Sequence, residues 1–482
     1  MRTSLLTILS ARVNTLDTSR ISPCRRPPQT EPSLPVFVVF VFLVVQFLSS
    51  LRSLCALCVL AIQLCFLRLI LDAQFRLRRV SLEPMPNEHW WNADFDLALQ
   101  PARDPSCDEG LQVQVRELAL HALIAAKAED SVLLFEPPPE DFLRYLKHRG
   151  IEIPEISLFP KVRSGFQFRP YGWSPQAIAL KEHYDMSVTS PPLKAVRRVN
   201  GRSFAHRIER EALDCNVPRG AFASLEELRV LLFSEPDRPE GWVAKTEHGN
   251  AALGNRRLRT RSPGEADIRW LKTRLEQGPM VLEWWLQRTK DLCTVFNVTA
   301  DGRVENFAVH EAIHTVDGGF IGAVYDRTTA TPEQWYEVLA ATAKTVATAL
   351  SQEGYFGPVC IDALIWNDCG TPRIRPLVDL NARRHASEGW CRLADLWGGC
   401  LYGRFFSVRK LRLPATYEEF ENALGADTWD PATRTGTIAT SPLWLRGPGN
   451  RRRPRKLGVV FRGRSRDNVF AMEKRFREVF EK

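Results

Sequence analysis

The sequence predicts a mixed fold in which an N-terminal α/β unit precedes a larger α+β region. Two observations predict it. A helix, a strand and a second helix follow one another between residues 112 and 149, the order of a parallel α/β unit. Further along, a long amphipathic helix at Thr331–Gly354 precedes two strands, Phe356–Trp366 and Arg375–Arg384, and we expect it to pack against their sheet.

The composition is that of an ordinary globular protein. The chain has 482 residues, enough for two or three domains, and is 44% hydrophobic and 25% charged. Its formal charge of +9 is spread along the chain, and aromatic residues do not interleave with the basic runs, which argues against nucleic-acid binding. The charge suits anionic small molecules instead.

The eleven cysteines show no repeating spacing. The pair Cys55 and Cys58 lies within an apolar run, so we expect neither a zinc site nor a redox pair there. A reducing, cytoplasmic compartment is therefore expected for the folded part.

The first 84 residues differ from the rest of the chain. Apolar runs at residues 34–51 and 54–67 each approach the ~18–20 residues that cross a bilayer, but only Arg52 and Ser53 separate them. One membrane span with an interfacial stretch, within residues 34–71, is one expectation. The other is that translation starts at Met85, so that the upstream segment, membrane-spanning or disordered, is not part of the working protein.

The N-terminal unit is expected at residues 85–200. Its predicted elements are a helix at Gln112–Lys127, a buried strand at Ser131–Phe135 and a helix at Asp141–Arg149. Residues 154–192 are rich in proline and glycine and predict loops and connectors. Ser203 is the expected cap of a helix that opens after Asn200.

A strand that ends at Lys245 leads into a loop containing Gly249 and Gly254. Glycines let backbone amides approach phosphate oxygens, and a lysine supplies a point charge to them. The alternative is an ordinary hairpin turn.

Two strands separated by a short linker are predicted over Val281–Val298. The carboxylates of Glu283 and Asp291 are suited to hydrogen-bond a ribose, and Trp284 and Trp285 to flank a purine. The alternative is that the two tryptophans anchor the core, which is the more common role of this residue.

The two strands after residue 355 carry three hard oxygen ligands. Asp379 and Asn381 alternate with Val378 and Leu380, so the polar pair shares one face, and Asp362 lies on the neighbouring strand. Carboxylate and amide oxygens suit Mg²⁺ held together with substrate phosphates. The alternative is that these are solvated carboxylates at strand ends.

The order of these motifs resembles the ATP-grasp superfamily over roughly residues 195 to 405, preceded by an α/β unit like the one that commonly precedes this fold. The resemblance implies that ATP lies between two α+β subdomains. It implies these roles: Lys245 and the loop of Gly249 and Gly254 at the phosphates, the backbone of Glu283, Trp284, Trp285 and Leu286 at the adenine, Asp291 at the ribose, Asp362, Asp379 and Asn381 on Mg²⁺ or Mn²⁺, and Arg383 at the transferred phosphoryl group.

The resemblance also implies the reaction. A small-molecule carboxylate attacks ATP to give an acylphosphate, which an amine or another nucleophile captures; the sequence identifies neither substrate. Asp379 and Asp291 stand where the family more often has Glu, and Arg202 or Arg207 replaces an earlier phosphate-binding lysine. A catalytically silent ATP-binding protein is therefore the second hypothesis.

A third hypothesis is a zinc metallopeptidase. His310, Glu311 and His314 match His-Glu-x-x-His, and Glu333 is a candidate third ligand. The motif requires a helix, whereas the apolar spacing between two glycine turns indicates a strand. The ATP-dependent ligase is therefore the favoured prediction.

Beyond Leu411 the sequence predicts helices and loops, closed by a strand at Leu457–Phe461 and a helix at Asp467–Phe480. The predicted domains are residues 1–84, 85–200, 201–410 and 411–482.

Overall fold

A parallel sheet opens the part of the chain that the computed structural model describes, which is residues 85–482 apart from 101–107, 160, 162–164, 187, 214–216, 235–238, 251–252, 329–330 and 448–449. Its strand order is β3-β2-β1-β4, with β1 Asn87–Trp90, β2 Ser131–Leu134, β3 Glu155–Leu158 and β4 Gln167–Pro170. Every residue of β2 is buried, as is usual in parallel sheets. The predicted α/β unit is thus present.

The helices of this unit are α4 Phe95–Ala98, α5 Glu109–Ala119, α6 Ala122–Ala125, α7 Glu140–His148 and α8 Pro175–His183. The single helix predicted at 112–127 is wrong, since the chain turns between α5 and α6. The prediction of loops throughout 154–192 is also wrong, because the segment holds β3, β4 and α8. The two strands are only four residues long, and α8 begins with the cap Ser174 followed by Pro175.

A small antiparallel sheet follows, after α9 Leu193–Val199 and α10 Arg202–Ala212. Its order is β5-β8-β6-β7, with β5 Arg219–Phe222, β6 Trp242–Asn250, β7 Leu253–Leu258 and β8 Met280–Trp284, joined by α11 Leu225–Ser234 and α12 Glu265–Leu275. Ser203 does not cap α10, because Gly201 is the N-cap and the Ser203 hydroxyl donates to Glu247 instead, at 2.7 Å.

The large antiparallel sheet has eight strands in the order β13-β12-β9-β10-β11-β14-β18-β15. The strands are β9 Arg288–Val298, β10 Val304–His314, β11 Phe320–Asp326, β12 Gly357–Asp368, β13 Thr371–Asn381, β14 Cys400–Ser407, β15 Gly436–Ala439 and β18 Lys456–Gly463. The helix predicted at Thr331–Gly354 is α13 Glu333–Gln352, and its N-cap is Pro332.

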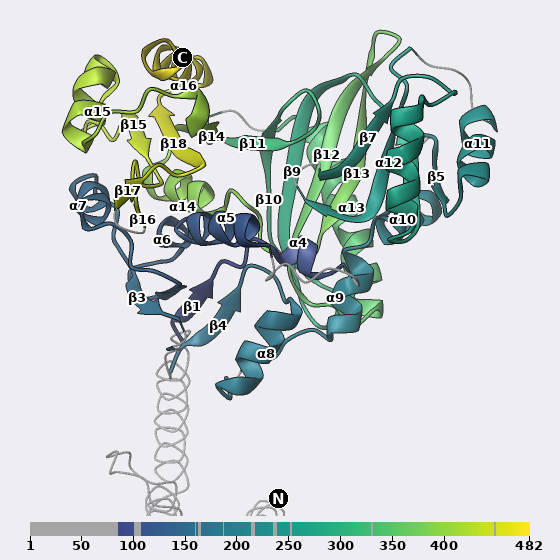
Figure 1. Cartoon of the computed structure of the whole chain (residues 1–482), viewed down its shortest axis with the longest axis horizontal. Coiled ribbons are helices and arrows are strands. Elements are labelled where there is room, and N and C mark those ends of the chain that lie inside the picture. Colours follow the sequence, from purple (N-terminus) through teal and green to yellow (C-terminus); the bar gives the residue numbers. More distant parts are fainter. Residues whose placement is uncertain are drawn as a thin grey trace, which may run out of the picture. The chain divides into compact units, whose positions relative to one another are not determined.

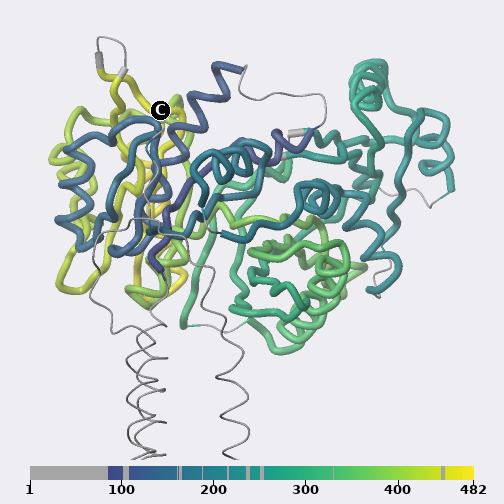
Figure 2. The backbone as a smooth tube through the Cα atoms, turned by 90° about the horizontal axis from the view of Figure 1, so that it is seen from below, coloured from purple at the N-terminus to yellow at the C-terminus, as the bar shows by residue number. Residues whose placement is uncertain are grey.

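The C-terminal segment connects the large sheet with the N-terminal unit. It contains α14 Glu388–Trp397, η2 Val408–Lys410, α15 Tyr417–Leu424, η3 Gly425–Asp427, the hairpin β16 Leu445–Gly447 and β17 Asn450–Arg452, and α16 Arg466–Phe480. The Tyr417 ring stacks on Tyr145 of α7 at 4.2 Å, and the Ala439 amide donates to the Tyr145 hydroxyl. Figure 2 shows these yellow elements beside the blue N-terminal unit. The final strand and helix are confirmed, whereas β15 and the hairpin were not predicted.

In the part of the chain that the structure describes, no helix is both long and apolar enough to cross a membrane. The apolar segment at residues 34–71 lies outside it.

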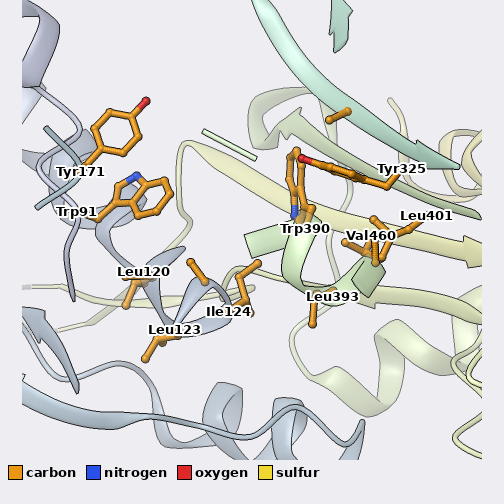
Figure 3. Close-up of a cluster of buried hydrophobic side chains, with 14 of the residues drawn as sticks. Trp91, Leu120, Leu123, Ile124, Tyr171, Tyr325, Trp390, Leu393, Leu401 and Val460 are labelled. Carbon is orange, nitrogen blue, oxygen red and sulfur yellow. The ribbon is translucent and has the colours of Figure 1, made fainter. Parts of the chain in front are cut away.

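One hydrophobic core runs from the N-terminal unit into the large sheet. Figure 3 shows Trp91 and Ile124 on one side and Trp390 and Val460 on the other, all within one buried cluster. Glycine at residue 403 of β14 permits this packing, since a Cβ there would lie 2.2 Å from Cδ2 of Trp390.

We expect Gly403→Ala to lower the free energy of unfolding by about 1–3 kcal/mol, because the added methyl group overpacks a rigid contact. The control is Gly264→Ala, where no atom lies within 4 Å of the new Cβ. Calorimetric melting of both variants checks this, and an equal effect of the two substitutions would contradict it.

Candidate active site

A cavity of about 290 Å³ lies between the two antiparallel sheets and α4 and α5 of the N-terminal unit. Figure 1 shows α4 and α5 between the parallel sheet and the strands of the large sheet. Most residues that the sequence singled out line this cavity: Lys245, Gly249, Glu283, Trp284, Trp285, Leu286, Asp291, Asp362, Asp379, Asn381 and Arg383. They come from β6, β8, β9, β12, β13 and the short segments after β8 and β13.

A buried ionic network centred on Glu283 forms one wall. Its carboxylate receives Lys245 Nζ at 2.5 Å and Arg375 Nη2 at 2.9 Å. Arg375 also donates from Nε to Glu209 at 2.7 Å, and Arg219 contacts both carboxylates. The network therefore joins the small sheet, the large sheet and α10. Glu209, Arg219 and Arg375 were missed by the sequence analysis, since they meet only in the folded chain.

The charges of this network do not balance. Three cations face two carboxylates, an excess of one positive charge. Burial alone would raise the pKa of Glu283, but Arg375 and Lys245 outweigh it and lower that pKa, so the carboxylate stays ionised. Burial lowers the pKa of Lys245 although Glu283 opposes the shift. The wall is thus suited to an additional anion.

Arg202 is a further cation that lines the cavity. Its Nη1 donates to the Thr246 carbonyl at 2.6 Å and its Nη2 to Asp379 at 3.3 Å. Its Nε is buried and has no hydrogen-bond acceptor among the described residues. Arg207 instead pairs with Glu353 and is half-exposed. Of the two arginines that the sequence offered, only Arg202 lines the cavity.

The three oxygen ligands lie together on β12 and β13. Asp362 and Asp379 are direct partners in the strand register, and Asn381 Nδ2 donates to Asp362 at 3.3 Å. Arg383 Nη2 donates to Asn381 Oδ1 at 2.9 Å, and its Nε pairs with Asp96 at 3.0 Å. Two carboxylates and an amide oxygen on adjacent strands are a donor set that fits a hard divalent cation.

The two carboxylates have opposite electrostatic environments. Burial raises the pKa of Asp362 to about 6, and the charge of Asp379 adds to this although His314 opposes it. Burial would also raise the pKa of Asp379, but Arg202 and Lys245 lower it below its usual value. Asp379 is therefore a fixed anion, whereas Asp362 carries an unfavourable charge at neutral pH.

Two thiols border Asp362. Cys293 Sγ lies 2.9 Å from Cys360 Sγ, and the ligand atoms of these cysteines and Asp362 all lie within 4.8 Å of one another. Mg²⁺ takes oxygen rather than sulfur, so the thiols do not belong to a magnesium ligand set. Sequence analysis missed them because they are 67 residues apart.

The segment after β8 divides its two tryptophans. Trp284 belongs to the core of the small sheet, where its ring meets Trp242 at 6.2 Å, although it also borders the cavity. Trp285 lies outside that core, and the Arg257 guanidinium lies 4.8 Å from its ring. Asp291 Oδ2 lies 3.1 Å from His314 Nδ1. The core-anchor alternative therefore holds for Trp284 alone.

The glycine loop differs from its prediction. Lys245 does not end its strand, since β6 continues to Asn250 and pairs with β7 as a hairpin. Gly249 lines the cavity, but Gly254 is not among its described lining residues. Gly254 has φ +93°, and a Cβ there would lie 2.3 Å from Thr246 Oγ1. The hairpin packing explains this glycine.

The metallopeptidase hypothesis is wrong. His310, Glu311 and His314 lie on strand β10, and the Glu311 carboxylate accepts two hydrogen bonds from Arg466, at 2.6 and 2.7 Å. The His310 ring stacks on Tyr325, and Glu333 is exposed at the start of α13. A motif that needs one helical face is thus divided between two faces of a sheet.

No protein-family model matches the chain. It is 24% identical over 299 residues to butirosin acyl-carrier protein L-glutamate ligase of Niallia circulans, a match that covers 58% of this chain and 66%, just under two thirds, of that ligase. It is also similar to the solved structures of phosphoribosylamine–glycine ligase from Thermotoga maritima and biotin carboxylase from Campylobacter jejuni. Each is 14% identical with a TM-score of 0.49; the first match covers 76% of this chain and 95% of the solved one, the second 77% and 89%.

The predicted ATP-grasp fold is confirmed by the sequence similarity to the Niallia circulans ligase and by the order of the sheets. Two antiparallel sheets enclose the cavity, and a parallel α/β unit precedes them.

Asp362 and Asp379 give opposite predictions for the stability of the metal-free protein, which is measured in the presence of EDTA. The folded-state pKa of Asp362 is raised to about 6, above the value of about 3.9 of an unfolded aspartate. The free energy of unfolding of the wild type therefore falls as the pH rises from about 4 to about 6. We expect Asp362→Asn to remove this loss and to melt higher at pH 7.5, by about 1–3 kcal/mol in unfolding free energy, with the difference vanishing near pH 4.

Asp379→Asn is the matched control. The pKa of Asp379 is lowered, so its stabilising contribution exists above the unfolded pKa and is lost in acid. We expect this variant to be less stable than the wild type at pH 7.5. Melting curves from pH 4 to 8 check both variants, and shifts of the same sign at pH 7.5 would contradict the assignment.

Proposed function

We propose that this chain is an ATP- and Mg²⁺-dependent carboxylate ligase that works through an acylphosphate. One observation supports it above the others: a buried wall with an excess of one positive charge faces a pair of carboxylates on adjacent strands across a single cavity. Polyphosphate supplies the missing negative charge, and a divalent cation suits the carboxylates. The two parts of a metal–nucleotide complex, an anion and a cation, therefore match the cationic wall and the pair of carboxylates.

The adenine is assigned to the segment after β8. The amides of Trp284 and Trp285 already donate to the carbonyls of Pro218 and Gly241, at 3.3 and 3.0 Å. The described residues give the Leu286 amide no acceptor, so this group and the Trp285 carbonyl are the proposed adenine contacts. Asp291 is the proposed ribose ligand, and its carboxylate lies 3.1 Å from His314 Nδ1.

The phosphates are assigned to Lys245 and Arg202. Both side chains are buried and border the cavity, and the orphaned Nε of Arg202 is a donor that a phosphate oxygen satisfies. Gly249 of the β6–β7 hairpin lets the backbone approach the same group. Preformed cations of this kind stabilise the developing charge of phosphoryl transfer without reorganisation.

Asp362, Asp379 and Asn381 are the proposed ligands of Mg²⁺, which neutralises phosphate charge when bound. Arg383 holds Asn381 through its amide oxygen and is itself fixed by Asp96. Its proposed role is to keep Asn381 oriented and to add positive charge where the phosphoryl group is transferred.

The reaction has two steps. An oxygen of the substrate carboxylate attacks the γ-phosphorus of ATP, the bond to the β-phosphate oxygen breaks, and ADP leaves. The acylphosphate is then attacked by an amine or another nucleophile, which loses a proton as inorganic phosphate departs. In the first step, Lys245 and Arg202 are the cations proposed to stabilise the negative charge that develops on the transferred phosphoryl group.

A catalytically silent ATP-binding protein is the second candidate. The observation that favours it is that both proposed phosphate cations already have carboxylate partners, Lys245 with Glu283 and Arg202 with Asp379. Such a protein would bind nucleotide without releasing ADP in response to any acid.

ADP release against a panel of carboxylic acids tests the proposal. We expect acid-dependent release, a hydroxamate when hydroxylamine traps the acylphosphate, and at least a hundredfold loss of both in Asp379→Ala, because the site loses its fixed anion. Equal release by wild type and variant would exclude this site as catalytic. Nucleotide binding without any acid-dependent release would favour the silent protein.

Arg202 and Arg207 form a matched pair on one helix. We expect Arg202→Ala to weaken ATP binding by about tenfold to a hundredfold, the value of one to two charge-assisted hydrogen bonds. Arg207→Ala should leave it unchanged, since that side chain pairs with Glu353 outside the cavity. Titration with a fluorescent ATP analogue checks this; equal losses would remove Arg202 from the phosphate site.

A further inference from the structure

One face of helix α5 lines the same cavity as the proposed phosphate cations, Lys245 and Arg202. Leu111, Gln114, Val115 and Leu118 follow the spacing i, i+3, i+4 and i+7, so they form a single stripe along the helix. Leu111 and Leu118 are only partly buried. Three of the four are apolar, and Leu118 also packs against the main core, whereas Leu111 borders the cavity and belongs to no buried cluster of the described residues.

The facing walls are also apolar. Trp91, Ala93 and Leu97 come from the N-terminal unit, and Phe405 from β14. His121 meets the Phe405 ring edge-on at 4.7 Å, and burial lowers the pKa of His121 to about 4, so it is uncharged at neutral pH. We name this end of the cavity the α5 compartment, lined by Trp91, Leu97, Leu111, Val115, Leu118 and Phe405.

Charge is distributed unevenly along the cavity. Its described carboxylates are Glu283, Asp291, Asp362 and Asp379, on β8, β9, β12 and β13 at the nucleotide end, and Asp317, in the turn between β10 and β11. The α5 compartment has none among the lining residues that the structure describes. Its one lysine, Lys456, is exposed and lies 5.8 Å from the Phe405 ring. An ammonium group placed here would lose water without gaining an anion.

We propose that the α5 compartment binds the apolar body of the carboxylate substrate, which is an aliphatic or aromatic monocarboxylic acid without an α-ammonium group. The inference rests on the proposed function, since it identifies the substrate class of the same site. The compartment and the phosphate cations belong to one cavity, so the carboxylate of such an acid faces the nucleotide while its chain lies along α5. Burying that chain removes apolar surface of both partners from water.

Two substrate classes fit less well. A free amino acid brings an ammonium group for which the compartment offers no carboxylate. A dicarboxylic acid brings a second anion, for which only the exposed Lys456 is near. Both would bury a charge without a matched partner, which is unfavourable in a low-dielectric site.

Binding and turnover, measured separately, test the inference. Calorimetric titration of the full chain with hexanoate, phenylacetate, succinate and glutamate, in the presence of Mg²⁺ and a non-hydrolysable ATP analogue, gives the affinities. We expect hexanoate and phenylacetate to bind at least tenfold more tightly than succinate and glutamate. ADP release with the same four acids should follow this order.

Two variants locate the binding. Leu118→Ala and Leu111→Ala should each weaken hexanoate binding by about five- to tenfold, the effect of removing part of an apolar wall, and leave the affinity for nucleotide unchanged. Val113→Ala is the matched control, since it shortens a partly buried side chain of the same helix that does not line the cavity. Leu111 lies outside every buried cluster of the described residues, so its variant should fold normally.

The outcomes separate the inference from the proposed function. Succinate or glutamate binding as tightly as hexanoate, or more tightly, would overturn the inference. ADP release that depends on succinate or glutamate and is unchanged in Leu111→Ala and Leu118→Ala would overturn it too. In both cases the ligase assignment would stand. Hexanoate binding that Leu118→Ala weakens, without ADP release from any acid, would support the compartment and overturn the ligase.

Discussion

The buried carboxylate of Glu283 is the contact on which the geometry of the cavity depends. It holds Lys245 of β6 and Arg375 of β13, so one side chain links the small sheet to the large one. Arg375 and Arg219 extend the link to Glu209 on α10. Such charges are stable only as a set, because removing one partner leaves the others desolvated and unpaired. The same interactions therefore link the two sheets and position Lys245, one of the two proposed phosphate cations.

The neighbouring carboxylates, Asp362 and Asp379, have opposite electrostatic environments when no ligand is bound. Asp379 is held ionised by Arg202 and Lys245, whereas burial makes the charge of Asp362, its partner across the strands, unfavourable. A protein selected for stability alone would place a neutral residue at Asp362, so its presence is more simply explained by binding. The excess positive charge around Glu283 has the same explanation. Under the proposed function, metal and polyphosphate would relieve both, so that their binding would be coupled within one cavity.

Sequence reasoning was most reliable where the pattern is local. Strand alternation put Asp379 and Asn381 on one face, and the register pairs Asp379 with Asp362 as the two-strand prediction required. It failed where partners are distant: Arg375 and Glu209 are 166 residues apart, and no periodicity predicts their contact. The four-residue strands β3 and β4 were missed because they are too short for alternation to be recognised among prolines and glycines.

The same distinction explains why the sequence indicated the nucleotide but not the acid. Resemblance to the ATP-grasp superfamily spans roughly residues 195 to 405, and every proposed nucleotide and metal ligand falls within that span. The α5 compartment is built from helix α5, from Trp91 and Leu97, which precede that helix, and from Phe405, which lies at the C-terminal end of the span. Side chains that bind a shared cosubstrate keep a common pattern, whereas a wall that fits one acid needs only the right shape and polarity, which many sequences satisfy. Substrate choice here therefore has to be argued from the surface of the cavity.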